Sequence, residues 1–359
     1  MRIALDAMGG DHAPRETVQG AAAAVRDPEL LALAGGPFEV LLVGRREVIE
    51  RELDGIEGVL RDRLPIIDAR ETVGMDEHPV QACKQKKDSS IVRCHDLIKR
   101  GEADATASAG NSGATMAAAL LTCGRIKGVS RPAIVTMVPS LQGVAVLVDA
   151  GANVDCRGKH LLQFALMGEA FARTALGFKK PRVGLLSIGE EETKGNELVF
   201  ETQSLLRAVP FNYIGNVEGR DVVNGNCDVI VCDGFTGNIT LKAIEGVGEL
   251  VLTQLKKEMR SNLFTLLGGL LAAPAFRRFK KMVDYKEYGG APLLGIDGIS
   301  LISHGKSNAY AMKNAVRAAM RCVQYGLDGA VREAIEKHGQ VKDPKPEGSG
   351  PEGAGESKP

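Results

Sequence analysis

Short apolar runs alternate with amphipathic helical segments along most of this chain, and this alternation constrains the fold more than any other feature. Strands buried in a parallel sheet have continuous apolar sequences, and the helices between them carry apolar residues at a spacing near 3.6. The pattern predicts βαβ units and an α/β fold with a largely parallel sheet. The predicted strands are Ile3–Leu5, Phe38–Val43, Ala103–Ser108, Ala133–Val138, Val144–Val148, Val183–Ser187, Tyr213–Ile214 and Val229–Cys232.

Three other stretches complete the predicted organisation. Leu161–Leu176 and Asn196–Val209 have helical spacing, and Gln142-Gly143 lies between two apolar runs, which is typical of a hairpin and adds one antiparallel edge. Residues 341–359 are rich in Pro, Gly, Glu and Lys. We therefore expect a single catalytic domain over 1–338 and a disordered tail over 339–359.

Composition excludes several classes of protein. The chain has 359 residues, with 45 Lys+Arg and 45 Asp+Glu, and this zero net charge argues against a dedicated nucleic-acid binder. Seven cysteines occur without a C-x-x-C pair, and no metal-ligand spacing is present, so neither a disulfide framework nor a metal site is expected. We find no signal peptide and no apolar run long enough to span a membrane, which predicts a cytoplasmic protein.

One segment, at about 250–285, differs from the rest of the chain. An apolar stretch, Leu263–Ala273, is flanked by Lys256, Lys257 and Arg260 on one side and by a basic run over 277–281 on the other. Apolar side chains between cations suit the surface of an anionic membrane. A hairpin buried in a core or in a dimer interface is the alternative. The candidate membrane-contacting residues are Leu263, Phe264, Leu266, Leu267, Leu270 and Leu271.

Four glycine-rich loops follow predicted strands, at the sheet edge where open α/β folds bind ligands. Glycine lets the backbone approach an anion, and the helix that follows supplies unpaired N–H groups. The loops span 6–14, 108–114, 233–238 and 303–307, and we expect them to form an anion-binding cleft. Their candidate phosphate- or substrate-binding residues are Asp6, Gly9, Gly10, Asp11, Ser108, Gly110, Asn111, Ser112, Gly113, Gly234, Thr236, Gly237, Gly305 and Ser307.

These loops do not match the common nucleotide or hydrolase motifs. The chain contains no G-x-x-x-x-G-K-[ST], no G-x-G-x-x-G, no H-E-x-x-H and no G-x-S-x-G. Lys194 follows a predicted strand and can meet a phosphate or a developing oxyanion as a point charge, although a solvated lysine beside acidic neighbours is the alternative. His304 is a candidate for proton transfer. Lys84, Lys86 and Lys87 form a basic cluster that can steer an acidic partner or simply be a solvated face.

Several blocks of the sequence, in order, resemble the PlsX family, the bacterial phosphate acyltransferases of phospholipid synthesis. The resemblance covers Met1 to about Tyr325 and leaves only the tail outside it, and one small departure is Ser112, where the family more often has Thr. The resembling blocks are Asp6–Pro14, Lys86–Ser90, Ser108–Ala114, Lys194–Asn196, Asp233–Asn238, Tyr288–Gly295 and Ser303–Ser307.

The resemblance implies a fold and an activity. The fold would be a three-layer α/β/α architecture similar to isocitrate/isopropylmalate dehydrogenase and phosphotransacetylase, usually a homodimer. The reaction would transfer a long-chain acyl group from acyl carrier protein to inorganic phosphate without a cofactor, and the acyl phosphate would feed a membrane glycerol-3-phosphate acyltransferase. The family's catalytic lysine and asparagine fall on Lys194 and Asn238, and the basic cluster gains an acidic carrier protein as its partner.

Three other functions remain open at this point. A short-chain phosphotransacetylase would use a coenzyme A thioester with the same chemistry. A dehydrogenase of the related fold would need a nicotinamide site and grouped acidic metal ligands, for which the sequence has no motif. A non-catalytic membrane scaffold would have no need for both Lys194 and Asn238.

Overall fold

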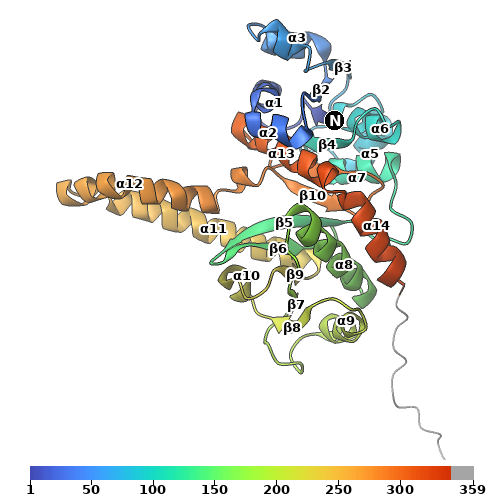
Figure 1. Cartoon of the computed structure of the whole chain (residues 1–359), viewed down its shortest axis with the longest axis vertical. Coiled ribbons are helices and arrows are strands. Elements are labelled where there is room, and N and C mark those ends of the chain that lie inside the picture. The colour runs from blue at the N-terminus through green and yellow to red at the C-terminus, as the bar shows by residue number, and fades with distance from the viewer. Residues whose placement is uncertain (341–359) are drawn as a thin grey trace, which may run out of the picture.

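The computed structural model describes residues 1–340, whose strands form one mixed sheet of eleven strands (Figure 1). The strands are β1 (Arg2–Asp6), β2 (Glu39–Gly44), β3 (Ile66–Asp68), β4 (Ala105–Ser108), β5 (Ala133–Ser140), β6 (Gly143–Val148), β7 (Val183–Leu186), β8 (Tyr213–Val217), β9 (Val229–Val231), β10 (Ala291–Leu294) and β11 (Ser300–Ile302). Their order is β3-β2-β1-β4-β11-β10-β5-β6-β9-β7-β8. Most neighbours pair in parallel, so the predicted fold class is confirmed.

Antiparallel pairing occurs in the middle of the sheet. β10 pairs antiparallel with β11 and with β5, and β5 forms the predicted hairpin with β6. The sequence predicted this hairpin at an antiparallel edge of the sheet. The hairpin is confirmed, but the predicted position is wrong, because β5 and β6 lie in the interior of the sheet. Because three successive pairings are antiparallel, the parallel strands of the two halves run in opposite directions. β3, β10 and β11 were not predicted.

Helices cover both faces of the sheet, which gives the three layers. They are α1 (Arg15–Arg26), α2 (Pro28–Ala34), α3 (Arg46–Leu53), α4 (Gly58–Arg61), α5 (Pro79–Gln85), α6 (Ser90–Lys99), α7 (Ser112–Thr122), α8 (Gly158–Ala175), α9 (Glu197–Arg207), α10 (Asp221–Asn224), α11 (Gly234–Glu258), α12 (Leu263–Val283), α13 (Ala309–Gln324) and α14 (Leu327–His338), with a 3₁₀ turn, η1, over Tyr285–Glu287.

Alternation along the strands divides the core between the two faces. In β6, Val146 and Val148 pack into the cluster with α8, whereas Ala145 and Leu147 pack into the cluster that includes Leu241 of α11. In the other half, α1 and α13 cover one face and α6 the opposite face.

Two long helices, α11 and α12, project side by side from the body of the molecule (Figure 1). α11 begins at Gly234, because Asp233 caps it by accepting a hydrogen bond from Thr236 N. α12 carries the apolar stretch and continues through Pro274. Among residues 1–340, no helix is long and apolar enough to cross a membrane. The predicted tail lies outside the described residues from 341 onward.

Gly289 lies between η1 and β10, at a position where we expect the stability of the fold to require glycine. Its φ is +78°, and a Cβ there would lie 2.1 Å from the backbone oxygen of Asn314 on α13. Gly35 has a similar φ of +71° but open space around it, which makes it a matched control. We expect Gly35→Ala to lower the free energy of unfolding by about 1–2 kcal/mol, and Gly289→Ala by more than about 3 kcal/mol, because overpacking adds to the strain. Urea denaturation measures both, and equal losses would contradict the packing argument.

Candidate active site

The loops after β1 and β4 are built around the buried carboxylate of Asp6. Its Oδ2 accepts a hydrogen bond from Ser108 Oγ at 2.7 Å, and its Oδ1 accepts one from Met8 N at 3.1 Å. Burial raises the pKa of the Asp6 carboxyl, and bonds from Ser90 and Ser108 oppose that shift. A Cβ on Gly9 would lie 2.6 Å from Asp6 Oδ2 and 2.7 Å from Gly110 N, so only glycine fits this contact between the loops. Asp6 therefore organises both loops through these hydrogen bonds.

The loop after β11 joins the same cluster. Asp11 N donates to Gly305 O at 2.8 Å, and a Cβ on Gly10 would lie 3.1 Å from that oxygen. Ser307 Oγ donates to His304 O at 2.6 Å, which closes the fourth loop on itself. Three of the four predicted loops are thus in direct contact.

Asn111 and Ser112 begin α7 within this cluster. Asn111 Oδ1 accepts from Ala114 N, and its Nδ2 donates to Met75 O at 2.9 Å. Ser112 is exposed, while Gly113 packs against Pro79, where a Cβ would lie 2.7 Å from Cγ. The N-terminal turn of α7 therefore opens to solvent beside the glycine loops, as an anion-binding helix start requires.

A second buried carboxylate, Asp149, organises the loop after β6, and the sequence analysis missed it. Its two oxygens accept five bonds, from the backbone N–H groups of Ile134, Gly151, Ala152 and Asn153 and from Asn153 Nδ2, at 2.7–3.1 Å. Burial raises the pKa of the Asp149 carboxyl, and these N–H donors oppose that shift. The signal was present: Asp149-Ala150-Gly151 follows an apolar run as the other four glycine loops do.

The Asp149 loop holds the start of α11. Gly234 N donates to Asn153 O at 2.7 Å, and a Cβ on Gly237 would lie only 1.9 Å from Asp149 O. Thr236 Oγ1 donates to Asp233 Oδ2 at 2.7 Å, so Thr236 serves the helix cap. Asn238, in the first turn, has an exposed side chain next to Gly151. The structure thus presents Asn238 at a helix start whose backbone is fixed by a buried carboxylate.

His304 connects the two halves of the site. Burial lowers the pKa of its imidazole, and the nearby Lys242 cation lowers it further. Lys242 lies one turn beyond Asn238 on α11 and forms an ion pair with Glu245 at 2.7 Å. The fourth loop and α11 therefore lie close together although they come from opposite halves of the sheet.

Lys194 lies on a loop held from behind by a buried amide pair that the sequence did not predict. Gln203 Nε2 donates to Asn216 Oδ1 at 3.0 Å, and Asn216 Nδ2 donates to the carbonyl oxygens of Glu191 and Lys194, both at 3.1 Å. These contacts fix the Lys194 backbone while its side chain is exposed.

Two of the acidic neighbours of Lys194 pair with arginines. Glu190 lies 3.0 Å from Arg220 Nη2, and Glu192 lies 2.6 Å from Arg207 Nη2. Within residues 1–340, Lys194 Nζ forms no ion pair of its own. Lys194 is therefore available to an anion, although the structure gives no direct contact between it and Asn238.

The basic cluster is only partly exposed. Lys86 Nζ lies 2.6 Å from Glu77 Oε1 and also donates to Thr72 O at 2.9 Å, and it holds the pKa of Glu77 below its usual value. Lys84 and Lys87 are exposed. Lys86 thus stabilises the loop before α5, and the exposed charge of this cluster comes from the other two lysines.

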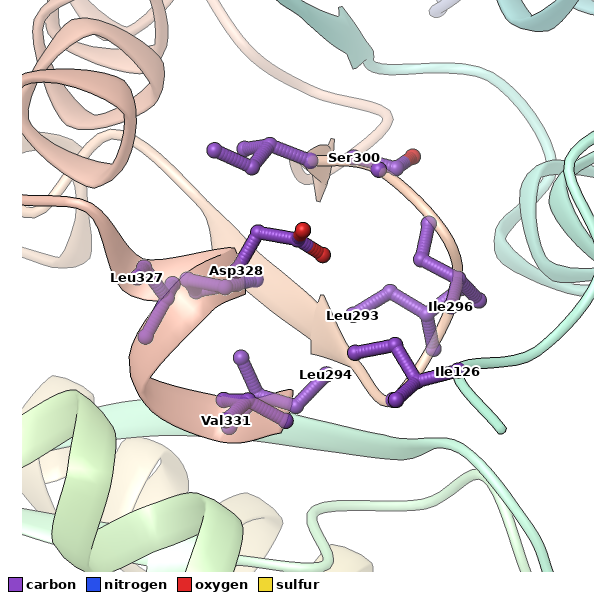
Figure 2. Close-up of a pocket in the computed structure, with 12 residues that line it drawn as sticks. Ile126, Leu293, Leu294, Ile296, Ser300, Leu327, Asp328 and Val331 are labelled. Atoms are coloured by element: carbon purple, nitrogen blue, oxygen red, sulfur yellow. The ribbon is translucent and has the colours of Figure 1, made fainter. Parts of the chain in front are cut away.

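Taken together, these loops can bind anions and donate N–H groups to an oxyanion. No group of three potential metal ligands occurs among the described residues. The small cavity in Figure 2, between the β10–β11 loop and α14, is mostly apolar; its one carboxylate, Asp328, pairs with Arg332 at 2.8 Å. That cavity is a packing defect in the scaffold and is separate from the loops.

Comparison with known proteins gives the same fold. The chain superposes on a phosphotransacetylase from Streptococcus pyogenes with a TM-score of 0.59 at 18% identity, covering 94% of each chain. It also superposes on 4-hydroxythreonine-4-phosphate dehydrogenase from Klebsiella pneumoniae with a TM-score of 0.53 at 16% identity, covering 90% of this chain and 99% of that one. The predicted similarity to phosphotransacetylases and to dehydrogenases of this architecture is confirmed.

Sequence relatives are much more similar. A phosphate acyltransferase of Heliobacterium modesticaldum is 51% identical over 93% of this chain and 98% of its own. A phosphate acyltransferase of Desulforamulus reducens is 49% identical over 96% of this chain and 100% of its own. A family model described as "Fatty acid synthesis protein" matches residues 1–328. The chain is therefore an acyltransferase and belongs to the PlsX family of fatty acid synthesis proteins.

Proposed function

We propose that this protein transfers a long-chain fatty acyl group from acyl carrier protein to inorganic phosphate, giving acyl phosphate for phospholipid synthesis. The observation that supports the proposal is that one helix carries Asn238 near its start and leads to the apolar segment of α12 at its end. α11 presents Asn238 in its first turn and extends for 25 residues, about 37 Å, toward the apolar segment of α12. A short-chain enzyme has no need for such an extension.

The chemistry needs no nucleophilic side chain, because phosphate is itself the nucleophile. A phosphate oxygen attacks the thioester carbonyl, a C–O bond forms, the C–S bond breaks, and the thiolate of the carrier protein leaves and takes up a proton. Holding the two reactants together and stabilising the oxyanion supply the catalysis. In this proposal the phosphate binds at the solvent-exposed start of α7, beside the loops of Gly9 and Gly110.

Lys194 and Asn238 act on the developing charge. The exposed Lys194, which has no ion pair among residues 1–340, neutralises phosphate or the oxyanion, and the Asn238 amide donates an N–H to the same oxygen. His304, near Lys242 and Glu245, moves the proton. These roles are supported by exposure at the ends of strands and by the absence of competing ion pairs at Lys194 among the described residues.

Exposed apolar and basic residues indicate which partners this protein contacts. The six candidate membrane-contacting side chains in the N-terminal half of α12 are all exposed, from 43% for Leu266 to 86% for Phe264. Burying them in a bilayer surface would place the enzyme peripherally on the inner face of the cell membrane, beside the membrane glycerol-3-phosphate acyltransferase. Lys84 and Lys87 would contact the acidic carrier protein, and we expect a homodimer.

The competing activity is a short-chain phosphotransacetylase that uses coenzyme A, which the shared fold favours. Purified protein is mixed with phosphate and either palmitoyl-acyl carrier protein or acetyl-coenzyme A, and acyl phosphate is trapped with hydroxylamine. We expect phosphate-dependent hydroxamate from the carrier-protein substrate alone. Product from acetyl-coenzyme A alone would establish the competing activity, and product from neither would remove both.

Lys194→Ala and Asn238→Ala should each lower turnover by at least about 100-fold, because each removes a donor to the transition-state charge. Both side chains are exposed, so thermal unfolding should be unchanged. Lys180→Ala, another exposed lysine of the same half, is the matched control and should retain activity. A wild-type rate in either variant would remove that residue from the mechanism.

Leu266→Glu combined with Leu270→Glu should weaken binding to phosphatidylglycerol liposomes, because it places charge on the apolar segment of α12. Leu141→Glu, which changes an 83% exposed leucine in the β5–β6 turn, is the control and should bind as wild type. Cosedimentation measures binding, and the solution rate should be largely retained. Unfolding of the double variant would instead show that the segment is buried against another surface.

A further inference from the structure

A second cavity, of about 200 Å³, lies where α12 returns to the body of the molecule. Its walls come from α8, α13, the β5–β6 hairpin and the segment that follows η1. None of the residues proposed above for the reaction lines it. It is therefore a separate feature that the proposed activity does not explain.

Most of the lining is apolar. Met137 and Val144 come from the hairpin, and Phe171 and Leu176 from α8 and its C-cap. On α13, Ala318 faces the cavity, and its small side chain leaves the space open. A cavity with this lining accepts a hydrocarbon chain.

The charged groups at the cavity are not balanced. Arg317 Nη2 donates to Glu287 O at 2.6 Å, and Arg321 Nη2 donates to Ala175 O at 2.8 Å. Both acceptors are neutral carbonyls, and within residues 1–340 neither guanidinium has a carboxylate within ion-pair distance.

The one carboxylate in the lining is turned to other partners. Glu287 Oε2 accepts from Tyr310 Oη at 2.8 Å and lies 4.0 Å from Lys281 Nζ. An arginine carries five N–H donors in a planar fork, so each guanidinium keeps donors beyond its single carbonyl bond. The cavity thus combines an apolar interior with two arginines, one helical turn apart, that have no carboxylate partner among residues 1–340; Arg321 also lies 5.8 Å from the centre of the Tyr325 ring.

We propose that this cavity binds a single-chain amphiphile with an anionic head group, its chain against Phe171 and Met137 and its head group on Arg317 and Arg321. A carboxylate and a phosphate head group share the required chemistry, since both accept paired N–H donors from a guanidinium. The inference goes beyond the proposed function, because it concerns ligand binding at a site apart from the glycine loops.

A hydrogen bond joins the segment that lines the cavity to the fourth glycine loop. Ser303 Oγ donates to Gly289 O at 3.0 Å, and Ser303 directly precedes His304. A Cβ on Gly290, which lines the cavity, would lie 2.9 Å from Ser303 Oγ. A ligand in the cavity would therefore contact the segment that positions the fourth loop.

Isothermal titration calorimetry tests the proposal with dodecanoate, dodecyl phosphate and uncharged dodecyl maltoside, each below its micelle concentration. We expect both anionic probes to bind and the maltoside to bind at least tenfold more weakly. The relative affinities of dodecanoate and dodecyl phosphate will show whether the site prefers a carboxylate or a phosphate head group. Arg317→Gln combined with Arg321→Gln should weaken the anionic probes at least tenfold. Ala318→Trp should abolish binding by filling the cavity. Arg173→Gln, an exposed arginine of α8 paired with Glu169, is the matched control and should bind as wild type.

Three results would overturn the proposal. The first is equal binding by wild type and the double arginine variant, which keeps the test valid if Ala318→Trp fails to fold. The second is loss of dodecyl phosphate binding in Lys194→Ala, which would place the probe at the candidate active site. The third is a change of molar mass by light scattering in Ala318→Trp, which would show that a second copy covers the cavity. The assay contains no carrier protein, so its failure is distinct from failure of the acyl-transfer assay.

Discussion

The carboxylate of Asp149 is the interaction on which the arrangement of the site depends. A carboxylate that is removed from water needs full hydrogen bonding, and Asp149 obtains it from five N–H groups. Those bonds shape the loop whose Asn153 carbonyl receives Gly234 N, and so they fix where α11 starts and in which direction it leaves. Asp6 has the same role in the other half of the sheet, where it holds Ser108 and the Gly9 turn. The loops of this site are thus organised by two buried carboxylates, whereas nucleotide-binding folds use a single G-x-G-x-x-G loop.

α11 connects the candidate active site to the exposed apolar segment of α12. Its first turn carries Asn238, its next turn brings Lys242 close to His304, and its far end leads into α12. A rigid helix transmits orientation over its whole length, so the position of the exposed apolar segment relative to the glycine loops is set by the bonds at Asp149. The region around the glycine loops presents cations and amide donors, and the described residues contain no cluster suited to a metal.

Sequence reasoning worked where one local pattern decides one local structure. The apolar runs predicted eight strands, and Gln142-Gly143 predicted the hairpin, because burial and turn chemistry act over a few residues. It failed where partners are remote. Ser300–Ile302 is too short and too polar at its start to be recognised as a strand without its neighbour β4.

The same limit applied to the site. The sequence pattern around Lys86 suggested a surface charge, but its partner Glu77, 2.6 Å away, could not be predicted from that pattern. Gln203 and Asn216 hold the Lys194 loop, yet no sequence motif marks them. Asp149 was not predicted although its loop follows an apolar run and contains glycine, as the four predicted loops do.

The place of β10 and β11 in the sheet has a consequence for biosynthesis. These strands, Ala291–Leu294 and Ser300–Ile302, are inserted between β4 and β5, which are separated by only 24 residues in the sequence. A nascent chain therefore makes both halves of the sheet before it makes the two strands that join them. Pairing over such long sequence separations is slow, and unpaired edges of β4 and β5 stay open while the ribosome completes the remaining residues. The late arrival of these two strands makes the final third of translation the interval in which this protein most needs protection from aggregation.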